Sequence, residues 1–353
     1  MLPNTFRHIP LLSFLCAVAS AQTILTLPAG IGDDPRSVVV IGNGSHVAIS
    51  NQVDGWLHVV NVTNQFNPTL ATSYNPPFGD QWFEAEYTPQ FGGRLFTGHR
   101  GGGLNMIDVS NPLAPVSVAQ VPTIYHFRGL RYRPLTSGGA LFYNETNSGL
   151  NVFQVNGTGT GMASVWNDYA ANQDGNGMEI VGDILYQMGT PPNATATRLH
   201  RGFDIGNPFL PVMTMNNTLV NQEPAGGHCQ LRKQPILPYV LASRWNDGLQ
   251  LHDCTFPNSP VIYPILPASP TIRCWGAAFI APTVAIAYGS VTVGSVTVYW
   301  WMFLQVLPGP VITPLGVITV PLDTHDITVN PNTNNIYVVG RVNGNGAGQL
   351  WVF

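Results

Sequence analysis

The chain has 353 residues, of which only 9% are charged, and its formal net charge is −4. Lysine occurs once, at Lys233, and no block of basic residues is present. Because phosphate backbones are bound by clustered Lys and Arg, this composition argues against nucleic acid as a partner.

The N-terminal segment 1–21 has the pattern of an export signal. Arg7 lies in a short polar start, residues 9–18 are apolar, and Ala19-Ser20-Ala21 fits the small-x-small cleavage pattern. We therefore expect a secreted or otherwise extracytoplasmic product, with one mature domain spanning 22–353. The apolar run is too short to span a bilayer, and no later segment predicts a membrane helix.

The mature chain repeats a phrase in which an apolar strand ends in Asp or a close substitute and prolines follow. Clear copies occupy 104–115, 202–211 and 251–260, and 61–68 has the same spacing. The Asp-equivalent positions are Asn61, Asp108, Gln154, Asp204, Asp253 and Gln305. With the last apolar strand, 349–353, they define seven units with a period of about 49 residues, which is typical of a propeller or solenoid. The third and sixth copies are degraded.

Each unit predicts four short strands, because apolar and polar residues alternate between Gly, Pro, Asn and Asp breakers. In the second unit the expected strands are 83–87, 94–97, 104–109 and 116–121. No sustained helical period is present in the mature chain. A four-stranded sheet cannot bury both faces alone, so the units must stack. The predicted fold is an all-β, seven-bladed β-propeller with four-stranded antiparallel blades.

The two ends of the chain predict how the ring closes. The last unit has no fourth strand, because the chain stops at Phe353. The segment 23–28 matches the fourth-strand pattern of 317–321 and precedes the first strand of unit one. We expect residues near 22–28 to pair with 349–353 and to fasten the ring.

The repeated phrase resembles the LVIVD-repeat family of secreted, seven-bladed β-propellers. The segment 104–115, which contains Asp-Val-Ser-Asn-Pro-x-x-Pro, is the best match, and the similarity covers nearly the whole mature chain. The resemblance implies the propeller fold and an extracytoplasmic location, but no agreed activity, cofactor or catalytic residue. Asp108, Asp204 and Asp253 recur with the phrase, so we assign their carboxylates to Asx turns rather than to catalysis.

Candidate binding residues are expected where loops converge on one face around the central channel. Charged residues of this charge-poor chain gather at those turns, including Arg36, Glu179 and Asp326. The candidate ligand-binding set is Glu84, His99, Arg100, His126, Arg128, His228, Arg244, Trp245, Arg273, His325 and Arg341.

Aromatic residues fall in or beside the same loops, namely Trp82, Tyr125, Trp245 and Trp275. On a rigid rim such rings stack on sugars or grip a peptide. Their commoner role is to wedge between blades as packing.

Three histidines, His126, His228 and His325, fall near the starts of innermost strands in units three, five and seven. His126 and His325 each follow a fourth-strand proline by four residues, so we expect them at the same register. Imidazoles that face one axis and leave one position open would suit a catalytic transition metal, with Glu84 as base or fourth ligand. The alternative is a polar, water-lined channel. No ligand-spacing motif supports a metal, so no cofactor is assigned.

Three cysteines follow the export signal: Cys229, Cys254 and Cys274. A Cys229–Cys274 disulfide across neighbouring blades is conceivable in an oxidising compartment. Buried thiols are favoured, because neighbouring inner strands diverge and cysteine is among the most buried residue types.

Two functions from different classes fit these observations. The first is a secreted binding or scaffolding module, expected as a monomer, that takes a protein, peptide or carbohydrate ligand on its loop-rich channel face. The second is a secreted metal-dependent hydrolase, lyase or oxidase that uses His126, His228 and His325. The first is preferred, because fold alone does not specify a reaction and no catalytic motif is present.

Overall fold

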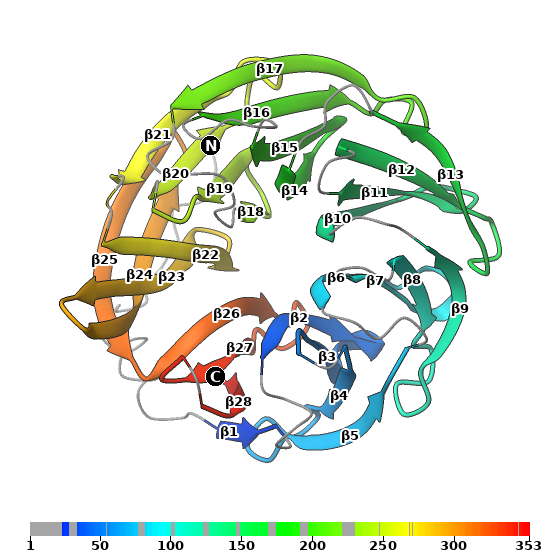
Figure 1. The fold of residues 1–353 in the computed structure, drawn as a ribbon, viewed down its shortest axis with the longest axis horizontal. Helices are drawn as coiled ribbons and strands as arrows, with labels where there is room; N and C mark the ends of the chain where they lie inside the picture. Colours follow the sequence, from blue (N-terminus) through cyan, green and yellow to red (C-terminus); the bar gives the residue numbers. More distant parts are fainter. Residues whose placement is uncertain are drawn as a thin grey trace, which may run out of the picture.

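The computed structural model describes residues 23–27, 34–53, 55–76, 82–99, 103–122, 127–145, 149–168, 174–190, 197–220, 230–246, 248–267, 269, 271–344 and 346–353. Seven four-stranded antiparallel sheets are arranged in a ring about a central axis, as Figure 1 shows. The predicted seven-bladed propeller is therefore confirmed. Within the described ranges the helical elements are two single 3-10 turns, η1 (Gly42–Gly44) and η2 (Gln90–Gly92).

The blades are numbered in chain order, and each runs from its innermost to its outermost strand. Blade 1 consists of β2 (Pro35–Ile41), β3 (His46–Asn51), β4 (Leu57–Asn61) and β5 (Thr69–Tyr74). Blade 2 consists of β6 (Trp82–Thr88), β7 (Arg94–His99), β8 (Gly103–Asp108) and β9 (Val116–Val121). Blade 3 consists of β10 (Phe127–Pro134), β11 (Gly139–Glu145), β12 (Gly149–Val155) and β13 (Met162–Asn167). Blade 4 consists of β14 (Asp174–Val181), β15 (Ile184–Thr190), β16 (Thr197–Asp204) and β17 (Val212–Val220). Blade 5 consists of β18 (Gln230–Lys233), β19 (Tyr239–Ser243), β20 (Leu249–Asp253) and β21 (Val261–Leu266). Blade 6 is β22 (Ile272–Ala281), β23 (Val284–Val293), β24 (Val296–Leu307) and β25 (Val311–Val320), and blade 7 is β26 (Leu322–Val329), β27 (Ile336–Val342), β28 (Gly348–Val352) and β1 (Thr23–Thr26).

Blade 7 is built from both ends of the chain, as the sequence predicted. The N-terminal strand β1 pairs antiparallel with β28, with Thr23 opposite Val352 and Thr26 opposite Gln349. In Figure 1 the blue first strand lies beside the red last strand. The next residue, Leu27, is 1% exposed and packs in the cluster between blades 7 and 1. This pairing closes the ring and leaves blade 7 with no missing strand.

The hydrophobic core is divided among the seven blade interfaces. Each buried apolar cluster joins residues of two neighbouring blades. Strand β3 shows the reason, because Val47 and Ile49 pack towards blade 7 whereas Ala48 between them packs towards blade 2. Successive side chains of a strand point to opposite faces, so both faces of a blade must be apolar. Strands buried on both faces leave few positions for charged side chains, in agreement with a chain of which only 9% of the residues are charged.

The repeated phrase forms Asx turns between the third and fourth strands, as predicted. The Oδ1 atom of Asp108 accepts a hydrogen bond from the Ser110 N–H at 2.8 Å, and Asp204 accepts one from the Gly206 N–H at 2.8 Å. Asp253 accepts from both the backbone and the hydroxyl of Thr255. The recurrence of Asp therefore reflects turn geometry.

The two degraded copies keep their strands and lose this turn chemistry. Blade 6 replaces it with a three-residue connection, 308–310, and its four strands are 10 to 12 residues long.

The two described cysteines, Cys254 and Cys274, are buried. Cys229 lies outside the described residues, so the less favoured alternative, a disulfide between Cys229 and Cys274, stays a hypothesis. Within the described ranges, no helix is long and apolar enough to cross a membrane.

Candidate functional site

The innermost strands enter the channel through a repeated irregularity. Within the described residues, six blades show a one-residue shift in the pairing with the second strand near the start of the innermost strand. The bulged residues are Arg36, Phe83, Arg128, Asn176, Trp275 and His325. A bulge changes which side chains face inward from that point on. It therefore decides which residues line the channel.

The bulges also correct one sequence-based alignment. His126 and His325 were expected at the same register, because each follows a fourth-strand Pro by four residues. In the structure the residue equivalent to His325 is Arg128, so His126 precedes the equivalent position by two residues. Counting from the proline failed because the entering segment of blade 3 is longer.

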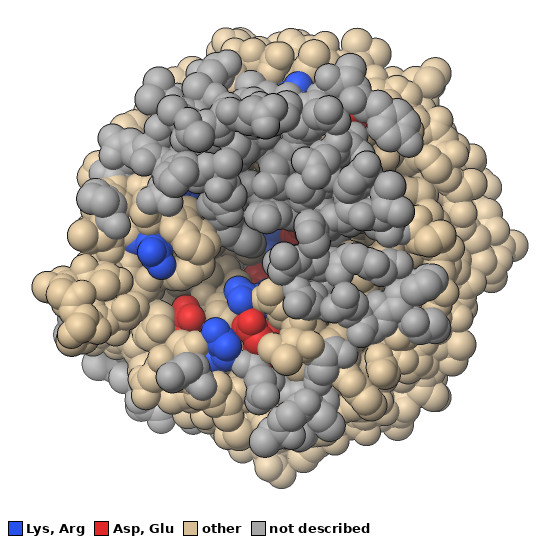
Figure 2. Space-filling model, in the orientation of Figure 1, with Lys and Arg blue, Asp and Glu red and all other residues tan. Residues whose placement is uncertain are grey.

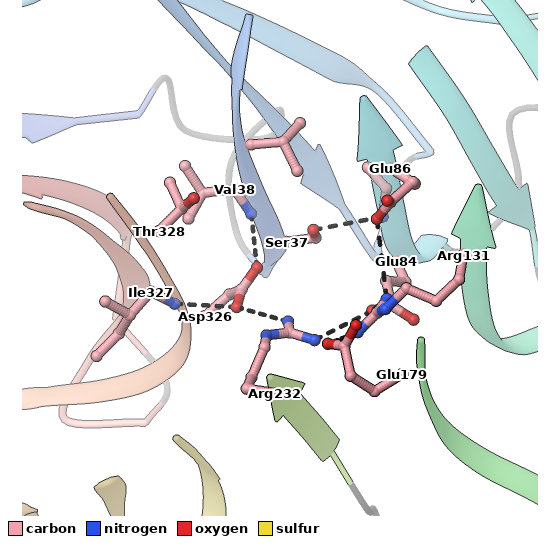
Figure 3. A pocket seen from close by; sticks show the side chains of 12 residues that line it. Ser37, Val38, Glu84, Glu86, Arg131, Glu179, Arg232, Asp326, Ile327 and Thr328 are labelled. Atoms are coloured by element: carbon pink, nitrogen blue, oxygen red, sulfur yellow. Dashed lines mark hydrogen bonds and ion pairs between the residues drawn. The ribbon is translucent and has the colours of Figure 1, made fainter. Parts of the chain in front are cut away.

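Beyond the bulges, one register position carries alternating charge around four consecutive blades. Glu86, Arg131, Glu179 and Arg232 each pair with the same position of the second strand in blades 2 to 5. Glu84 and Asp326 each follow the bulge directly in blades 2 and 7. Six charged side chains are thus directed towards one region of the channel, as Figure 3 shows.

Two arginines hold this network together. Arg131 Nη1 lies 2.6 Å from Glu84 Oε1, and Arg131 Nη2 lies 3.5 Å from Glu179 Oε2. Arg232 bridges Glu84 at 3.3 Å and Asp326 at 3.2 Å. The side chain of Arg131 is only 8% exposed, so these carboxylates are needed to compensate its buried positive charge.

Backbone amides fix three of the carboxylates. Glu84 accepts from the Leu130 N–H at 3.1 Å, and Glu179 accepts from Ile180 and Lys233. Asp326 accepts from the N–H groups of Val38 and Ile327, both at 3.0 Å. Leu130, Lys233 and Val38 each belong to the blade next to that of the carboxylate they contact, so the network also joins neighbouring blades.

The two glutamates of β6 have opposite electrostatic environments. Burial opposes ionisation of Glu84, but the charges of Arg131 and Arg232 outweigh it and lower its pKa. Burial raises the pKa of Glu86 to about 7; Arg131 offsets only part of this effect, while Glu179 and Glu84 add to it. For Arg131, the three carboxylates outweigh burial and raise the pKa further above its ordinary value. Glu86 is thus the carboxyl whose charge changes near neutral pH.

A cavity of about 240 Å³ opens among these side chains. Its lining comes from the innermost strands of blades 1 to 5 and 7: Ser37, Val38, Val39, Glu84, Ala85, Glu86, Arg131, Glu179, Arg232, Asp326, Ile327 and Thr328. Figure 2 shows acidic and basic side chains gathered in the central hollow of this face. The cavity is the candidate functional site.

Of the sequence-based candidates that fall within the described residues, only Glu84 lines this cavity. Glu179 and Asp326, which were expected on the channel face, line it as well. Sequence reasoning missed Glu86, Arg131 and Arg232. The available signal was the period-two placement of charge in an innermost strand, such as Glu84 and Glu86 on either side of Ala85.

His325 belongs to a second polar cluster at the junction of blades 7 and 1. Its Nδ1 lies 2.7 Å from the Pro35 carbonyl oxygen and 3.2 Å from Asp34 Oδ1, and its Nε2 lies 3.5 Å from Asp323 Oδ2. Arg341 Nε lies 3.6 Å from the same Asp34 oxygen. Burial and Arg36 lower the pKa of His325, but the two aspartates outweigh them and raise it.

The histidine metal site predicted from the sequence stays a prediction. His126 and His228 lie outside the described residues, and both ring nitrogens of His325 face protein acceptors. A metal would have to displace one of those contacts. Among the described residues, no group of three or more His, Cys, Asp or Glu has a metal-binding arrangement.

The remaining candidates that the structure describes do not line the cavity. Arg100 and the side chain of Arg128 lie outside the description. His99 is fully buried in blade 2, where its Nε2 lies 2.8 Å from Asn105 Nδ2, and Arg244 is 3% exposed. Replacing Arg244 would therefore disturb packing, so it is not a useful test of surface binding.

Arg273 and two tryptophans form a separate stack at the edge of blades 5 and 6. The guanidinium carbon of Arg273, an exposed residue, lies 5.3 Å from the ring centroid of Trp245. The Trp245 and Trp275 rings meet edge to face at 4.2 Å. Both tryptophans are half-buried, so they combine packing with a partly accessible aromatic surface.

Two buried histidines between blades 4 and 5 predict acid sensitivity. His200 and His252 have ring centroids 4.6 Å apart. Burial and then Arg244 lower the pKa of His200 to about 4, and burial, His200 and Arg244 lower that of His252 well below its usual value. The unfolded chain therefore takes up these protons first as the pH falls. Their contribution to stability is complete above pH 6.5 and is lost as the pH falls towards 4.

We expect the free energy of unfolding to drop by roughly 2–3 kcal/mol between pH 7 and pH 4.5 through His200 alone. The measurement is urea unfolding at both pH values for the parent chain and for His200→Gln. The variant should lose less stability on acidification than the parent, whatever its stability at pH 7. Half-buried His46 provides the control, and His46→Gln should change the pH dependence less. An unchanged pH dependence in His200→Gln would contradict the assignment.

No protein-family model matches this chain, and no curated protein matches it by sequence. Among solved structures, the chain is similar to Sqt1 of Saccharomyces cerevisiae, with a TM-score of 0.58 and 10% sequence identity. The similarity covers 94% of this chain and 99% of that one. At this identity the likeness shows the β-propeller fold alone.

Proposed function

We propose that this chain is a secreted β-propeller that acts as a binding or scaffolding module, and that it takes its ligand at the channel cavity. The observation that carries the proposal is the set of six charged side chains around that cavity. Buried charges contribute little net stability, because desolvation offsets their attraction. Their concentration in a chain with only 9% charged residues therefore favours a role in binding.

The ligand class is a protein, a peptide or a carbohydrate. The accessible part of the Trp245 and Arg273 stack offers a second contact for a ligand that extends beyond the channel. The N-terminal segment 1–21 supports export, and the repeated phrase supports a relationship to the LVIVD-repeat propellers. Export is tested by sequencing the N-terminus of the chain recovered from culture medium, which we expect to begin at Gln22.

A cavity-filling variant tests whether ligands are taken in the channel. A glycan array and a displayed random-peptide library are screened with the chain starting at Gln22. Each ligand found is then titrated against Val39→Trp, which fills the cavity, and against Leu113→Ser. Leu113 is 58% exposed in the turn between β8 and β9 and does not line the cavity.

We expect Val39→Trp to weaken binding at least tenfold and Leu113→Ser to leave it unchanged. Thermal melting of both variants establishes that the ring is intact. Ligands that bind Val39→Trp as tightly as the parent would remove the channel from the proposal.

A further inference from the structure

Among the described residues, the charges that line the cavity do not balance. Four carboxylates, Glu84, Glu86, Glu179 and Asp326, face two guanidiniums, Arg131 and Arg232. The formal charge of the described lining is therefore −2 when all groups are ionised. An anionic ligand would add to this excess, whereas a cationic group would reduce it.

The excess is concentrated at Glu86. Its carboxylate lies 3.9 Å from the nearest guanidinium nitrogen, that of Arg131, whereas the corresponding distance for Glu84 is 2.6 Å. Glu179 and Asp326 have ion pairs at 3.5 and 3.2 Å. The Glu86 side chain is 28% exposed, and it lines the cavity. It is therefore the carboxylate most available to a new counter-ion.

The size of the cavity limits what can enter. Pockets for drug-sized ligands usually enclose about 300–1,000 Å³. A cavity of about 240 Å³ falls below that range. It therefore suits a single small group, such as one amino-acid side chain or one small amine, rather than a whole oligosaccharide.

We propose that the cavity takes one cationic nitrogen group, an ammonium or a guanidinium, with Glu86 as its principal counter-ion. This inference rests on the proposed binding function and specifies the ligand class of the same site. The group arrives either on a free small amine or on a Lys or Arg side chain of a polypeptide. Both sources share the chemistry that the carboxylates recognise.

Binding of such a group should depend on pH, because it requires ionised Glu86. The charged groups that face Glu86 are Glu84 on its own strand, Arg131 on β10, Glu179 on β14 and Arg232 on β18. The pKa of Glu86 is raised to about 7, so most Glu86 is protonated at pH 6 and ionised at pH 8. The affinity for a cation should therefore fall about tenfold from pH 8 to pH 6.

The experiment uses matched small probes and the chain starting at Gln22. n-Butylguanidinium and n-butylammonium are titrated by calorimetry or NMR at pH 8, beside the neutral isostere N-butylurea and the anion pentanoate. We expect both cations to bind at least tenfold more tightly than the urea, and pentanoate to bind most weakly. A blocked glycine–lysine–glycine tripeptide and its norleucine analogue distinguish the two sources: tighter binding of the lysine peptide than of n-butylammonium indicates a polypeptide side chain, and the reverse indicates a free amine.

Two variants identify the residue responsible. Glu86→Gln should weaken cation binding at least tenfold and abolish its pH dependence, without lowering the melting temperature at pH 8. Asp183→Asn removes the same charge at a site 67% exposed and away from the cavity, and it should bind the cations as the parent does.

The inference is overturned if the urea or pentanoate binds as tightly as the cations, or if Glu86→Gln binds them like the parent. It is also overturned if no cation binds while ligands from the screens still require an open cavity, in which case the proposed function stands. Ligands from the screens that ignore Val39→Trp would instead reject the proposed function itself.

Discussion

Replacing Arg131 with methionine should lower the free energy of unfolding by about 3–5 kcal/mol, because it leaves buried carboxylates without their counter-ion. Arg131 contacts carboxylates of blades 2 and 4 and also donates to the Leu231 carbonyl oxygen of blade 5 at 3.2 Å. Its loss should therefore weaken several blade contacts at once. The measurement is chemical unfolding at pH 7.

Arg133 provides a matched control on the same strand. It pairs with Asp183, whose side chain is 67% exposed, and a pair of this kind contributes about 0–1 kcal/mol. Arg133→Met should therefore have a small effect. Adding Glu179→Gln to Arg131→Met should restore part of the lost stability, because Glu179 pairs with Arg131 and would otherwise keep a buried charge without that partner, whereas Glu84 still has Arg232. Equal losses for Arg131→Met and Arg133→Met would show that the channel network does not contribute to folding as described.

Removing the N-terminal strand should have the second large effect. A chain that begins at Pro28 lacks β1 and the buried side chain of Leu27, so the edge of β28 is exposed and the ring is left open. In a domain of this size, a loss of about 3 kcal/mol lowers the melting temperature by roughly 4 °C. We expect the shortened chain to lose considerably more than this. The comparison is the chain that begins at Gln22, measured by circular dichroism and calorimetry.

Point variants separate lost packing from lost pairing. Leu27→Ala should cost about 2–5 kcal/mol, because Leu27 is 1% exposed. Ile24→Ala in the same strand should cost much less, because Ile24 is 46% exposed. If the chain beginning at Pro28 melted with the parent, closure by β1 would not stabilise the ring.

Much of the fold could be predicted from the sequence, because local rules specify it. The spacing of prolines after Asp108, Asp204 and Asp253 encodes a turn. The phrase recurs at six positions, two of them degraded, and with the last apolar strand it predicts seven blades. The unmatched strand at each end of the chain was sufficient to predict the β1–β28 pairing. These features depend on neighbours in the chain or on the period of the repeat.

The candidate site could be predicted only in part. Glu84, Glu179 and Asp326 were expected on the channel face, but Glu86, Arg131 and Arg232 were not. A bulge explains why Arg131 was missed, since the extra residue Arg128 changes which side chains of β10 point inward. Glu86 could have been found from its period-two spacing to Glu84. The spacing of prolines does not predict such a bulge, and for this reason His126 was aligned wrongly with His325.

The sequence by itself determined the number of blades, the strand pattern, the Asx turns and the way the ring closes, because each follows from residues adjacent in the chain or repeated at a fixed period. The tertiary structure alone decided which charges meet in the channel and which of them titrate near neutral pH. The pKa of Glu86 depends on Arg131, Glu179 and Glu84 together with its burial, and the packing of blades 2, 3 and 4 against one another brings these groups within reach of one another.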